Sequence, residues 1–349
     1  GQGGRRRRGH AVELRPVRCD HRQGGQAHST RGRRRPGVQA HLAGTGNTSI
    51  TRDDVLAARE AIAGRLHRTP TFSSATLGPR VHLKGELFQR TGSFKPRGVL
   101  NSLSRLSEEE RRRGVIAASA GNHAQALAYC SALEGIDALL VMWRTASEAK
   151  IAATRGYGAE VDLVAWDPAE MFERLEELRR ETGRTLVHPF DSANTIAGQG
   201  TVGLEIGEDV PGVDVVVVPV GGGGLISGIA TALPDVRIVG VEPELSNALT
   251  AALDAGRPVP VTPTSIADGL NAPFAGELPL RIAQERAITT VLVEEEEIAA
   301  AMRLLYERAK LACEPAGAAA VAALMNGKAA SEEDETVVCV VTGGNVAAQ

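Results

Sequence analysis

One lysine in the chain has neighbours that suit covalent chemistry. Lys95 lies in the segment Ser93-Phe94-Lys95-Pro96-Arg97-Gly98, where it follows a Gly-Ser turn and an aromatic residue at the predicted start of a helix. A lysine amine can form an imine with a carbonyl compound and can also carry a proton. Because a lysine beside a turn is about as often an ordinary surface residue, this motif alone leaves both interpretations open.

A cluster of glycines between a predicted strand and a predicted helix has the features of an anion site. Gly221, Gly222, Gly223 and Gly224 follow the apolar run 213–220 and precede Leu225 and a helical pattern. Glycines let the backbone approach a ligand closely and present N–H groups, and the helix dipole adds to the attraction for negative charge. The cluster therefore predicts a phosphate site, although a lone glycine cluster is about as often a plain tight turn.

Two further turns follow predicted strands. Residues 119–125, Ser-Ala-Gly-Asn-His-Ala-Gln, combine small side chains with several N–H donors, which suits a carboxylate, and the Asn122 amide can reach a polar ring atom. His123 in this turn is more often a structural residue at a helix start than a catalytic base. Thr342 ends another strand ahead of Gly343, Gly344 and Asn345 and offers a hydroxyl, which by itself indicates only a turn.

Short apolar runs that alternate with helical patterns predict a layered α/β fold. Apolar residues recur at helical spacing from Val55 to Leu66, behind a predicted cap at Thr51. Unbroken apolarity in other runs indicates strands covered on both faces, as in a parallel sheet between helices. Such sheets gather ligands at the carboxyl ends of their strands, where the four motifs fall. Strands are predicted over residues 81–84, 114–119, 137–143, 159–164, 213–220, 236–242, 288–293 and 336–342.

The charge of the chain is unevenly distributed, with a boundary near Asn47. Residues 1–47 hold eleven arginines against Glu13 and Asp20, whereas the chain of 349 residues has a net charge of -3. The arginine- and glycine-rich start lacks periodic apolar positions, so we expect disorder there. A basic arm can bind nucleic acid, but this one has no aromatic residue for base stacking. We therefore favour a nonfunctional extension translated from a misplaced start.

The remaining composition is typical of a cytosolic globular protein. With 43% apolar residues, the chain can bury a large core without disulfides or metals. Its cysteines show neither the CxxC nor the Cys/His pairing of a disulfide framework or zinc site. No apolar run reaches the roughly 18 to 20 residues of a membrane span, and no secretory signal is visible. We therefore expect a cytoplasmic location and no membrane partner. The cysteines are Cys19, Cys130, Cys313 and Cys339.

Together the four motifs resemble the fold type II pyridoxal-phosphate enzymes, the tryptophan synthase β-like group, and within it the threonine/serine dehydratase and serine racemase branch. The resemblance runs from about residue 50 to 345 and includes QRTGSFKPRG, KIAATRGYGAEV, HPFDSANTIAGQGTVGLEI, ADG at 267–269 and CEPAGAAAVAAL. It implies pyridoxal 5'-phosphate as cofactor and two open parallel-sheet α/β domains with the cofactor in the cleft between them. The expected division is a large cofactor-binding domain over 48–113 and 190–349, and a small substrate-binding domain over 114–189.

The resemblance also implies a role for each motif. Lys95 would bind the cofactor as a Schiff base and move the Cα proton of the substrate. Phe94 would pack against the cofactor ring, and Asn122 would bond its hydroxyl. The glycines 221 to 224, with Leu225, would bind the phosphate. The substrate carboxylate would be held by the turn Ser119, Ala120, Gly121, Asn122 and His123.

Two further residues are expected at the cofactor ring. Thr342 would face the ring nitrogen, where most dehydratases of this group carry serine. A neutral partner leaves that nitrogen largely unprotonated, which weakens the cofactor as an electron sink and favours prompt loss of a β-hydroxyl. Glu314 in the CEPAGA segment would lie near the ring, with its role open between catalysis and structure.

The expected reaction is elimination of water from L-threonine, L-serine or both, giving 2-oxobutyrate or pyruvate and ammonia. Racemases of this branch use a serine as second base at the position of Ala120, and an alanine cannot accept a proton, which favours elimination. Glu242 matches one of two carboxylates that bind a cation in racemase-like members, and the other falls at or near Ala248, so metal dependence is not expected. The chain stops soon after Asn345, and we expect no regulatory domain and no inhibition by isoleucine.

Two other classes of function remain open from the sequence. A β-replacement or threonine synthase-like enzyme would share Lys95 and the glycine loop, but would need a second nucleophile or a basic site for a phosphate-bearing substrate. A protein that only binds the cofactor or nucleic acid would not require Lys95, Asn122 and the glycine loop together. We expect a homo-oligomeric enzyme that acts on a small hydroxy amino acid and has no nucleic-acid partner.

Overall fold

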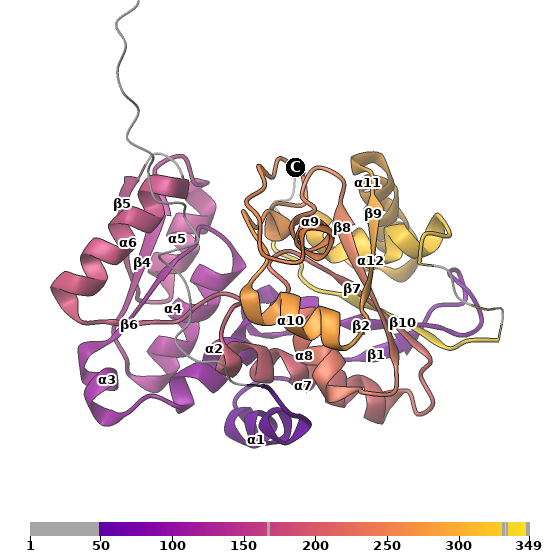
Figure 1. Ribbon diagram of the computed structural model, residues 1–349, viewed down its shortest axis with the longest axis horizontal. Coiled ribbons are helices and arrows are strands. Elements are labelled where there is room, and N and C mark those ends of the chain that lie inside the picture. The colour runs from indigo at the N-terminus through magenta and orange to yellow at the C-terminus, as the bar shows by residue number, and fades with distance from the viewer. Residues whose placement is uncertain (1–48, 166–167, 330–331, 333, 347–349) are drawn as a thin grey trace, which may run out of the picture. The chain divides into compact units, whose positions relative to one another are not determined.

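The structure is a computed structural model that describes residues 49–165, 168–329, 332 and 334–346 (Figure 1). The extension predicted to be disordered, residues 1–47, lies outside the described residues. Within them the strands form one sheet of six strands and another of four. All eight predicted strands are present, and the predicted α/β fold built on parallel sheets is confirmed.

The larger sheet has the strand order β1-β2-β10-β7-β8-β9. β1 pairs antiparallel with β2, and every other neighbouring pair is parallel. Val337 lies opposite both Val81 and Val215, so the last strand of the chain is inserted between two earlier ones. The strands are β1 Thr71–Ser73, β2 Val81–Gly85, β7 Val215–Pro219, β8 Arg237–Pro243, β9 Thr289–Val293 and β10 Val337–Val341.

The smaller sheet is entirely parallel and has the order β5-β4-β3-β6. Its strands are β3 Val115–Ala118, β4 Ala138–Trp143, β5 Glu160–Ala165 and β6 Thr185–Leu186. β6 and β1 were not predicted, because two or three residues are too few to produce a recognisable apolar run.

Helices connect the strands and lie on both faces of the sheets (Figure 1). α1 begins as predicted, with the Thr51 side chain accepting from the Asp54 N–H and the Asp54 carboxylate accepting from the Thr51 N–H. No helix among the described residues is long and apolar enough to cross a membrane. The helices are α1 Arg52–Ile62, α2 Lys95–Ser104, α3 Glu108–Arg113, α4 Asn122–Glu134, α5 Glu148–Gly156, α6 Pro168–Thr182, α7 Ala193–Asp209, α8 Gly224–Ala232, α9 Ala248–Ala255, α10 Glu277–Glu285, α11 Glu295–Leu304 and α12 Pro315–Met325.

The unbroken valine runs are buried on both faces, as predicted. In β7, Val215 and Val217 face a core shared with α11 and α12, whereas Val216 and Val218 face a second core shared with α8, α9 and α10. In the smaller sheet, alternate residues of β3 face α4 on one side and α6 on the other. Burial on two faces removes the alternation of polar and apolar residues that a half-exposed strand would show.

Helix α7 packs closely against α2 and α8 through glycines. A methyl group at Gly198 would lie 2.5 Å from the carbonyl oxygen of Arg97 in α2. One at Gly228 of α8 would lie 2.4 Å from the carbonyl oxygen of Ile196 in α7. Only glycine allows backbones to approach this closely. Because α2 begins at the predicted cofactor lysine and α8 begins in the glycine loop, both motifs are anchored to the same helix.

Candidate active site

Lys95 begins helix α2, and its amine faces protein rather than bulk water. Its Nζ donates a hydrogen bond to the Pro189 carbonyl oxygen, 3.1 Å away, and lies 5.0 Å from the centre of the Phe94 ring. The side chain is half-buried. Burial lowers the pKa of Lys95 to about 8, against the opposing effect of the negative charge of Glu314. A lowered pKa leaves part of the amine unprotonated near neutral pH, as a nucleophile or base requires.

The segment before Lys95 is held against the end of β10. Ser93 pairs with Gly343 in an isolated antiparallel bridge, and the Phe94 N–H donates to the Thr342 carbonyl oxygen at 3.2 Å. The Thr342 hydroxyl is buried and donates to the Ala316 carbonyl oxygen at 3.3 Å. Thr342 and Phe94, predicted from separate motifs, are therefore neighbours.

The turn between β3 and α4 meets the same region through Asn122. The Asn122 Nδ2 donates to Glu314 Oε1 at 2.7 Å, and its Oδ1 accepts from Asn345 Nδ2 at 2.8 Å. The Ser119 hydroxyl accepts from the Gly121 N–H at 3.2 Å, Ala120 is buried, and a methyl group at Gly121 would meet nothing within 4 Å. The turn thus offers open space beside a fixed amide.

Glu314 is the N-cap residue of α12, makes no capping hydrogen bond with its side chain, and is almost completely buried. Burial raises the pKa of Glu314 to about 7, although its hydrogen bond from Asn122 favours the charged form. The carboxylate also lies against the turn after β10, because a methyl group at Gly343 would come within 2.3 Å of its Oε1. Glu314 therefore lies beside Asn122 and is close enough to Lys95 for its negative charge to raise the pKa of the amine.

The glycine loop connects β7 to α8 in the predicted position. Gly223 has a φ of +93°, which strongly favours glycine, and Gly224 and Leu225 form the first turn of α8. A methyl group at Gly222 would lie 2.4 Å from the Phe190 ring, and one at Gly221 3.2 Å from Leu270. The loop backbone is thus packed closely against two other segments.

Residues 187–191, which we call the linking segment, join these motifs. The Val187 carbonyl oxygen pairs with His123 Nε2 at 2.9 Å, and the Pro189 carbonyl oxygen accepts from Lys95. Phe190 packs on the glycine loop, and Asp191 accepts from two N–H groups at the start of α10, both at 3.0 Å. The residues HPFD at 188–191 belong to a stretch that resembles the family, but the sequence predicted no role for them. Their contacts are to residues far away in the chain, which no local pattern reveals.

Several buried polar atoms near Lys95 have no hydrogen-bond partner among the described residues, including Ser93 Oγ, His123 Nδ1 and His188 Nε2. His188 Nδ1 accepts from the Asp191 N–H at 2.8 Å, so the neutral ring carries its hydrogen on Nε2. Burial, with the charge of Lys95, lowers the pKa of both histidines to about 3, which keeps them neutral. Each unpaired buried group costs roughly 1–3 kcal/mol, so the site suits a ligand rich in polar atoms.

Comparison with known proteins identifies the family. The family model described as "Pyridoxal-phosphate dependent enzyme" matches residues 62–343. The chain belongs to this family. The predicted cofactor and the predicted family resemblance are thereby confirmed.

Relatives of this pyridoxal-phosphate enzyme include named lyases. The L-threonine ammonia-lyase of Thermotoga maritima is 45% identical over 279 residues, which cover 77% of this chain and 69% of that protein. The catabolic L-threonine dehydratase TdcB of Escherichia coli is 41% identical over 275 residues, covering 76% and 84%.

Solved structures agree in fold. Maize serine racemase superposes with a TM-score of 0.82 at 35% identity, covering 86% of this chain and 95% of that one. A threonine deaminase from the organism abbreviated T.th. gives a TM-score of 0.80 at 38% identity, covering 86% and 99%. Both structures superpose on 86% of this pyridoxal-phosphate enzyme with TM-scores of 0.82 and 0.80. The predicted fold type II architecture is therefore confirmed.

The residues around Lys95 fit such a cofactor. The lysine amine, with its lowered pKa, suits an aldehyde, and the start of α8 suits a phosphate. The unpartnered atoms of Ser93, His123 and His188 and the space at Gly121 suit the polar substituents of the ring and of a substrate. A bulky aliphatic ligand would leave these atoms unpaired.

Glu242, the possible metal ligand, lies near the end of β8, beside the end of β7 that leads into the glycine loop. It is fully buried and accepts from the Leu249 and Thr250 N–H groups at 2.7 and 2.8 Å and from the Thr250 hydroxyl at 2.6 Å. Both carboxylate oxygens therefore cap the start of α9, which begins at Ala248, the second predicted position. The described residues contain no group of three or more His, Cys, Asp or Glu side chains suited to a metal.

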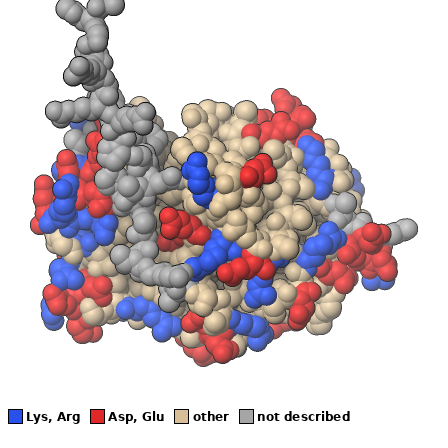
Figure 2. All heavy atoms as spheres, in the orientation of Figure 1, with Lys and Arg blue, Asp and Glu red and all other residues tan. Residues whose placement is uncertain are grey.

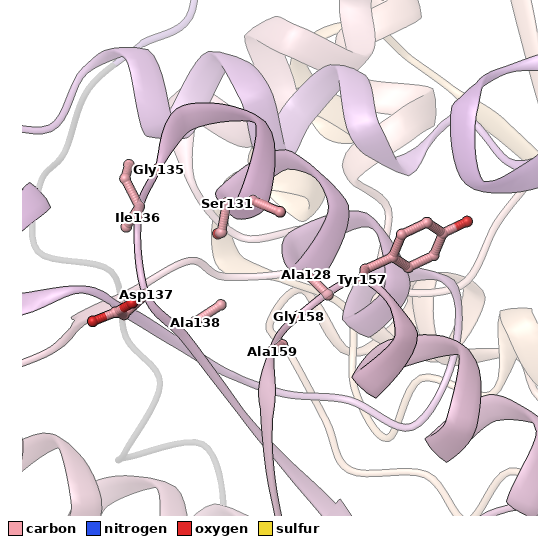
Figure 3. Close-up of a pocket in the computed structure, with 10 residues that line it drawn as sticks. Ala128, Ser131, Gly135, Ile136, Asp137, Ala138, Tyr157, Gly158 and Ala159 are labelled. Atoms are coloured by element: carbon pink, nitrogen blue, oxygen red, sulfur yellow. The ribbon is translucent and has the colours of Figure 1, made fainter.

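A separate surface hollow lies at the end of the smaller sheet that is opposite to the Ser119 turn (Figure 3). Its lining comes from the end of α4, the start of β4 and the turn before β5, and includes Ser131, Ala138 and Tyr157. Because β3 and β4 are parallel, the start of β4 is remote from the Ser119 turn at the end of β3. The hollow is thus not part of the Lys95 site.

Figure 2 shows that acidic and basic side chains are mixed over the described surface in that view.

Proposed function

We propose that this pyridoxal-phosphate enzyme is an ammonia-lyase that removes water from L-threonine, L-serine or both, yielding 2-oxobutyrate or pyruvate and ammonia. The observation that carries the proposal is the convergence of the Lys95 amine, the glycine loop and the Asn122 turn on the linking segment. The names of relatives at 41% and 45% identity support the same reaction.

We assign cofactor binding to residues that the fold brings near Lys95. Lys95 would hold the cofactor covalently, and Phe94 would lie against its ring. The N–H groups of Gly221 to Gly224 and Leu225 would bind the phosphate, with the dipole of α8 adding to the attraction. Asn122 would bond the ring hydroxyl, Thr342 would offer a neutral hydroxyl to the ring nitrogen, and Glu314 would orient Asn122.

The turn from Ser119 to His123 would hold the substrate carboxylate, because its small residues expose backbone N–H groups beside open space at Gly121. His123 would contribute its backbone N–H, because its neutral ring donates to the Val187 carbonyl oxygen through Nε2 and has no hydrogen on Nδ1 to offer a carboxylate. A carboxylate held this way would present the substrate Cα toward Lys95.

Bound pyridoxal phosphate supplies an electron sink that makes the Cα proton of an attached amino acid acidic. Lys95 Nζ would take that proton, for which its lowered pKa is suited. The β-hydroxyl would then leave as water with a proton from the bound phosphate group, and hydrolysis of the released enamine would give the 2-oxo acid and ammonia. Ala120 lies in the same turn and has no group that can accept a proton on a second face. We therefore propose elimination and not racemisation as the main reaction, although the fold is equally similar to a serine racemase.

The proposal also includes a domain division, a cellular location and an oligomeric state. Residues 48–113 and 190–349 would form the cofactor-binding domain and 114–189 the substrate-binding domain. Their boundary would coincide with the division between the two sheets. We also propose that the enzyme works in the cytoplasm as a homo-oligomer, as expected from its cysteine pattern and family.

The test is to supply the full chain with pyridoxal phosphate and to measure visible absorbance, 2-oxo acid and ammonia with threonine, serine and bulkier β-hydroxy amino acids. Lys95→Ala should abolish both the absorbance of lysine-bound cofactor and product formation. Lys328→Ala, which alters a lysine paired with Glu297 far along the chain, should retain both. An active Lys95→Ala enzyme would refute the mechanism, and racemisation as fast as elimination would refute the preferred reaction.

A further inference from the structure

Asn345, which follows β10 in the turn Thr342-Gly343-Gly344-Asn345, contacts three parts of the site. Its Nδ2 donates to the Thr91 carbonyl oxygen and to Asn122 Oδ1, both at 2.8 Å. Its backbone N–H lies beside the Glu314 carboxylate, whose pKa it lowers against the larger opposite effect of burial. The segment is also anchored by the Gly344 N–H, which donates to the Gly92 carbonyl oxygen at 2.9 Å.

The orientation of the Asn345 amide is determined by a backbone atom. A carbonyl oxygen such as that of Thr91 only accepts hydrogen bonds, so the group facing it must be the Nδ2 of Asn345. A reversed amide would place its oxygen against the oxygens of both Thr91 and Asn122. The other side of the amide is closely packed, since a methyl group at Gly92 would lie 2.5 Å from Asn345 Oδ1.

The orientation of Asn345 in turn determines that of Asn122. Both hydrogens of Asn345 Nδ2 are used, one of them by Asn122 Oδ1, so Asn122 must present its oxygen to Asn345 and its Nδ2 to Glu314. One of the two Asn122 Nδ2 hydrogens is taken by Glu314 Oε1 at 2.7 Å. Counting donors leaves one Asn122 N–H available for a ligand.

The Thr91 carbonyl that anchors this arrangement belongs to a strained residue. Thr91 has a φ of 59°, a left-handed conformation that side chains with a branched Cβ rarely adopt. Such strain persists only where the surroundings impose it, and it is concentrated at functional sites. The hydrogen bond from Asn345 is one contact that holds this carbonyl in place.

We propose that Asn345 is a positioning residue that orients the Asn122 amide and so leaves one N–H directed to the ring hydroxyl of the cofactor. The inference rests on the proposed assignment of Asn122 to that hydroxyl. Asn345 itself would touch neither cofactor nor substrate. Its effect would be transmitted through Asn122, and this dependence separates a positioning role from a general contribution to folding.

The first measurement is the dissociation constant of pyridoxal phosphate for the apoprotein of Asn345→Asp. This substitution keeps the shape but removes both Nδ2 hydrogens, so Asn122 would no longer be held in the binding orientation. We expect binding to weaken by on the order of tenfold, as for the loss of one hydrogen bond to a ligand. Asn326→Asp is the matched control, because Asn326 also donates to a backbone carbonyl, that of Ala322, but at the end of α12. It should leave the constant unchanged.

The second measurement repeats Asn345→Asp in an Asn122→Ala background, with thermal unfolding of each apoprotein recorded alongside. If Asn345 acts through Asn122, the substitution should change cofactor affinity less than about twofold in that background. An equal loss in both backgrounds, or no loss in the parent chain, would overturn the inference. Should Asn345→Asp fail to fold, Asn345→Ala removes the same donors and takes its place.

The outcome separates this inference from the proposed function. A parent chain that forms no lysine-bound cofactor or makes no 2-oxo acid refutes the function. A parent chain that does both, but in which the effects at positions 345 and 122 are additive, refutes only the positioning role.

Discussion

Helix α2 carries two buried polar clusters that differ in how fully they are hydrogen-bonded. We call the first the Arg97 network, formed by Thr69, Lys84, Glu86, Arg97 and Glu205, and the second the Lys95 site, with Ser93, His123 and His188 around the amine. Residues two positions apart in a helix point to nearly opposite sides. Lys95 and Arg97 therefore extend into different surroundings, although they lie in the same turn. Both clusters are inside the protein, but only the Arg97 network has its charged groups fully hydrogen-bonded.

The Arg97 network satisfies its own charges. The Arg97 guanidinium bonds Glu86 at 2.8 and 2.9 Å and Glu205 at 2.7 and 2.9 Å, in two forked pairs. Lys84, fully buried, adds an ion pair of 2.7 Å to Glu205. Paired charges with complete hydrogen bonding can be buried without a ligand. The network therefore holds the start of α2 against α7 whether or not the cofactor is bound.

The Lys95 site lacks such partners. Ser93 Oγ, His123 Nδ1 and His188 Nε2 are buried and unpaired among the described residues. The contrast teaches that burial alone does not distinguish a structural polar cluster from a ligand site. The distinction lies in whether the hydrogen-bonding capacity has been used, and this can be tested by changing each cluster separately.

The largest expected effect is on the Arg97 network. Arg97→Leu would leave the buried Glu86 carboxylate without a charged partner and Glu205 with Lys84 alone, and should lower the free energy of unfolding of the apoprotein by about 3–5 kcal/mol. Urea titration measures this loss. The control is Arg59→Leu, because Arg59 pairs with Glu208 on the surface, and the expected loss there is below about 1 kcal/mol. Similar losses for the two variants would contradict the structural role of the network.

The next effect is on the contact between the glycine loop and the linking segment. Gly222→Ala would force a methyl group against the Phe190 ring, which should reduce the free energy of unfolding by about 1–3 kcal/mol and weaken cofactor binding. Gly156→Ala is the control, because a methyl group there meets nothing within 4 Å. Its stability should be unchanged or higher by up to about 1 kcal/mol. Unaltered cofactor affinity in Gly222→Ala would contradict the phosphate assignment.

A pair of hydroxyl deletions compares the two clusters directly. The Thr69 hydroxyl bonds Glu86 and Glu205, so Thr69→Val should destabilise the apoprotein by roughly 1–3 kcal/mol. The Ser93 hydroxyl has no partner among the described residues, so Ser93→Ala should change stability by less than about 1 kcal/mol and instead reduce cofactor affinity or activity. Urea titration and cofactor titration of both variants test this, and a reversed order of stability losses would show the comparison to be wrong.

The smallest expected effect concerns pH. The Lys95 amine must be unprotonated to attack the cofactor aldehyde, so the rate of covalent capture should rise with pH and level off above about 8, the pKa of Lys95. Burial lowers that pKa and the charge of Glu314 raises it, so Glu314→Gln should move the midpoint to lower pH. Stopped-flow absorbance of apoprotein mixed with pyridoxal phosphate measures the midpoint. A shift to higher pH would contradict the placement of Glu314.

Much of the fold could be predicted because burial leaves a local pattern. The eight longer strands, the cap at Thr51 and the helices starting at Lys95 and after the glycine loop all follow from apolar periodicity and residue preferences within short windows. β1 and β6 could not be predicted, since their few residues carry too little pattern. Motifs such as the glycine loop were recognisable for the same reason: a tight turn constrains only adjacent residues.

Which motifs meet was decided by the tertiary structure. The hydrogen bond between Lys95 and Pro189 joins residues 94 positions apart, and those of Asn122 to Glu314 and Asn345 span 192 and 223 positions. Such contacts depend on the order of strands in the sheets, with β10 inserted between β2 and β7, and no local pattern encodes that order. The chain alone therefore specified the elements and the types of reactive residue. The packed fold determined which polar atoms are paired and which remain for a ligand, because hydrogen-bond satisfaction depends on neighbours in space.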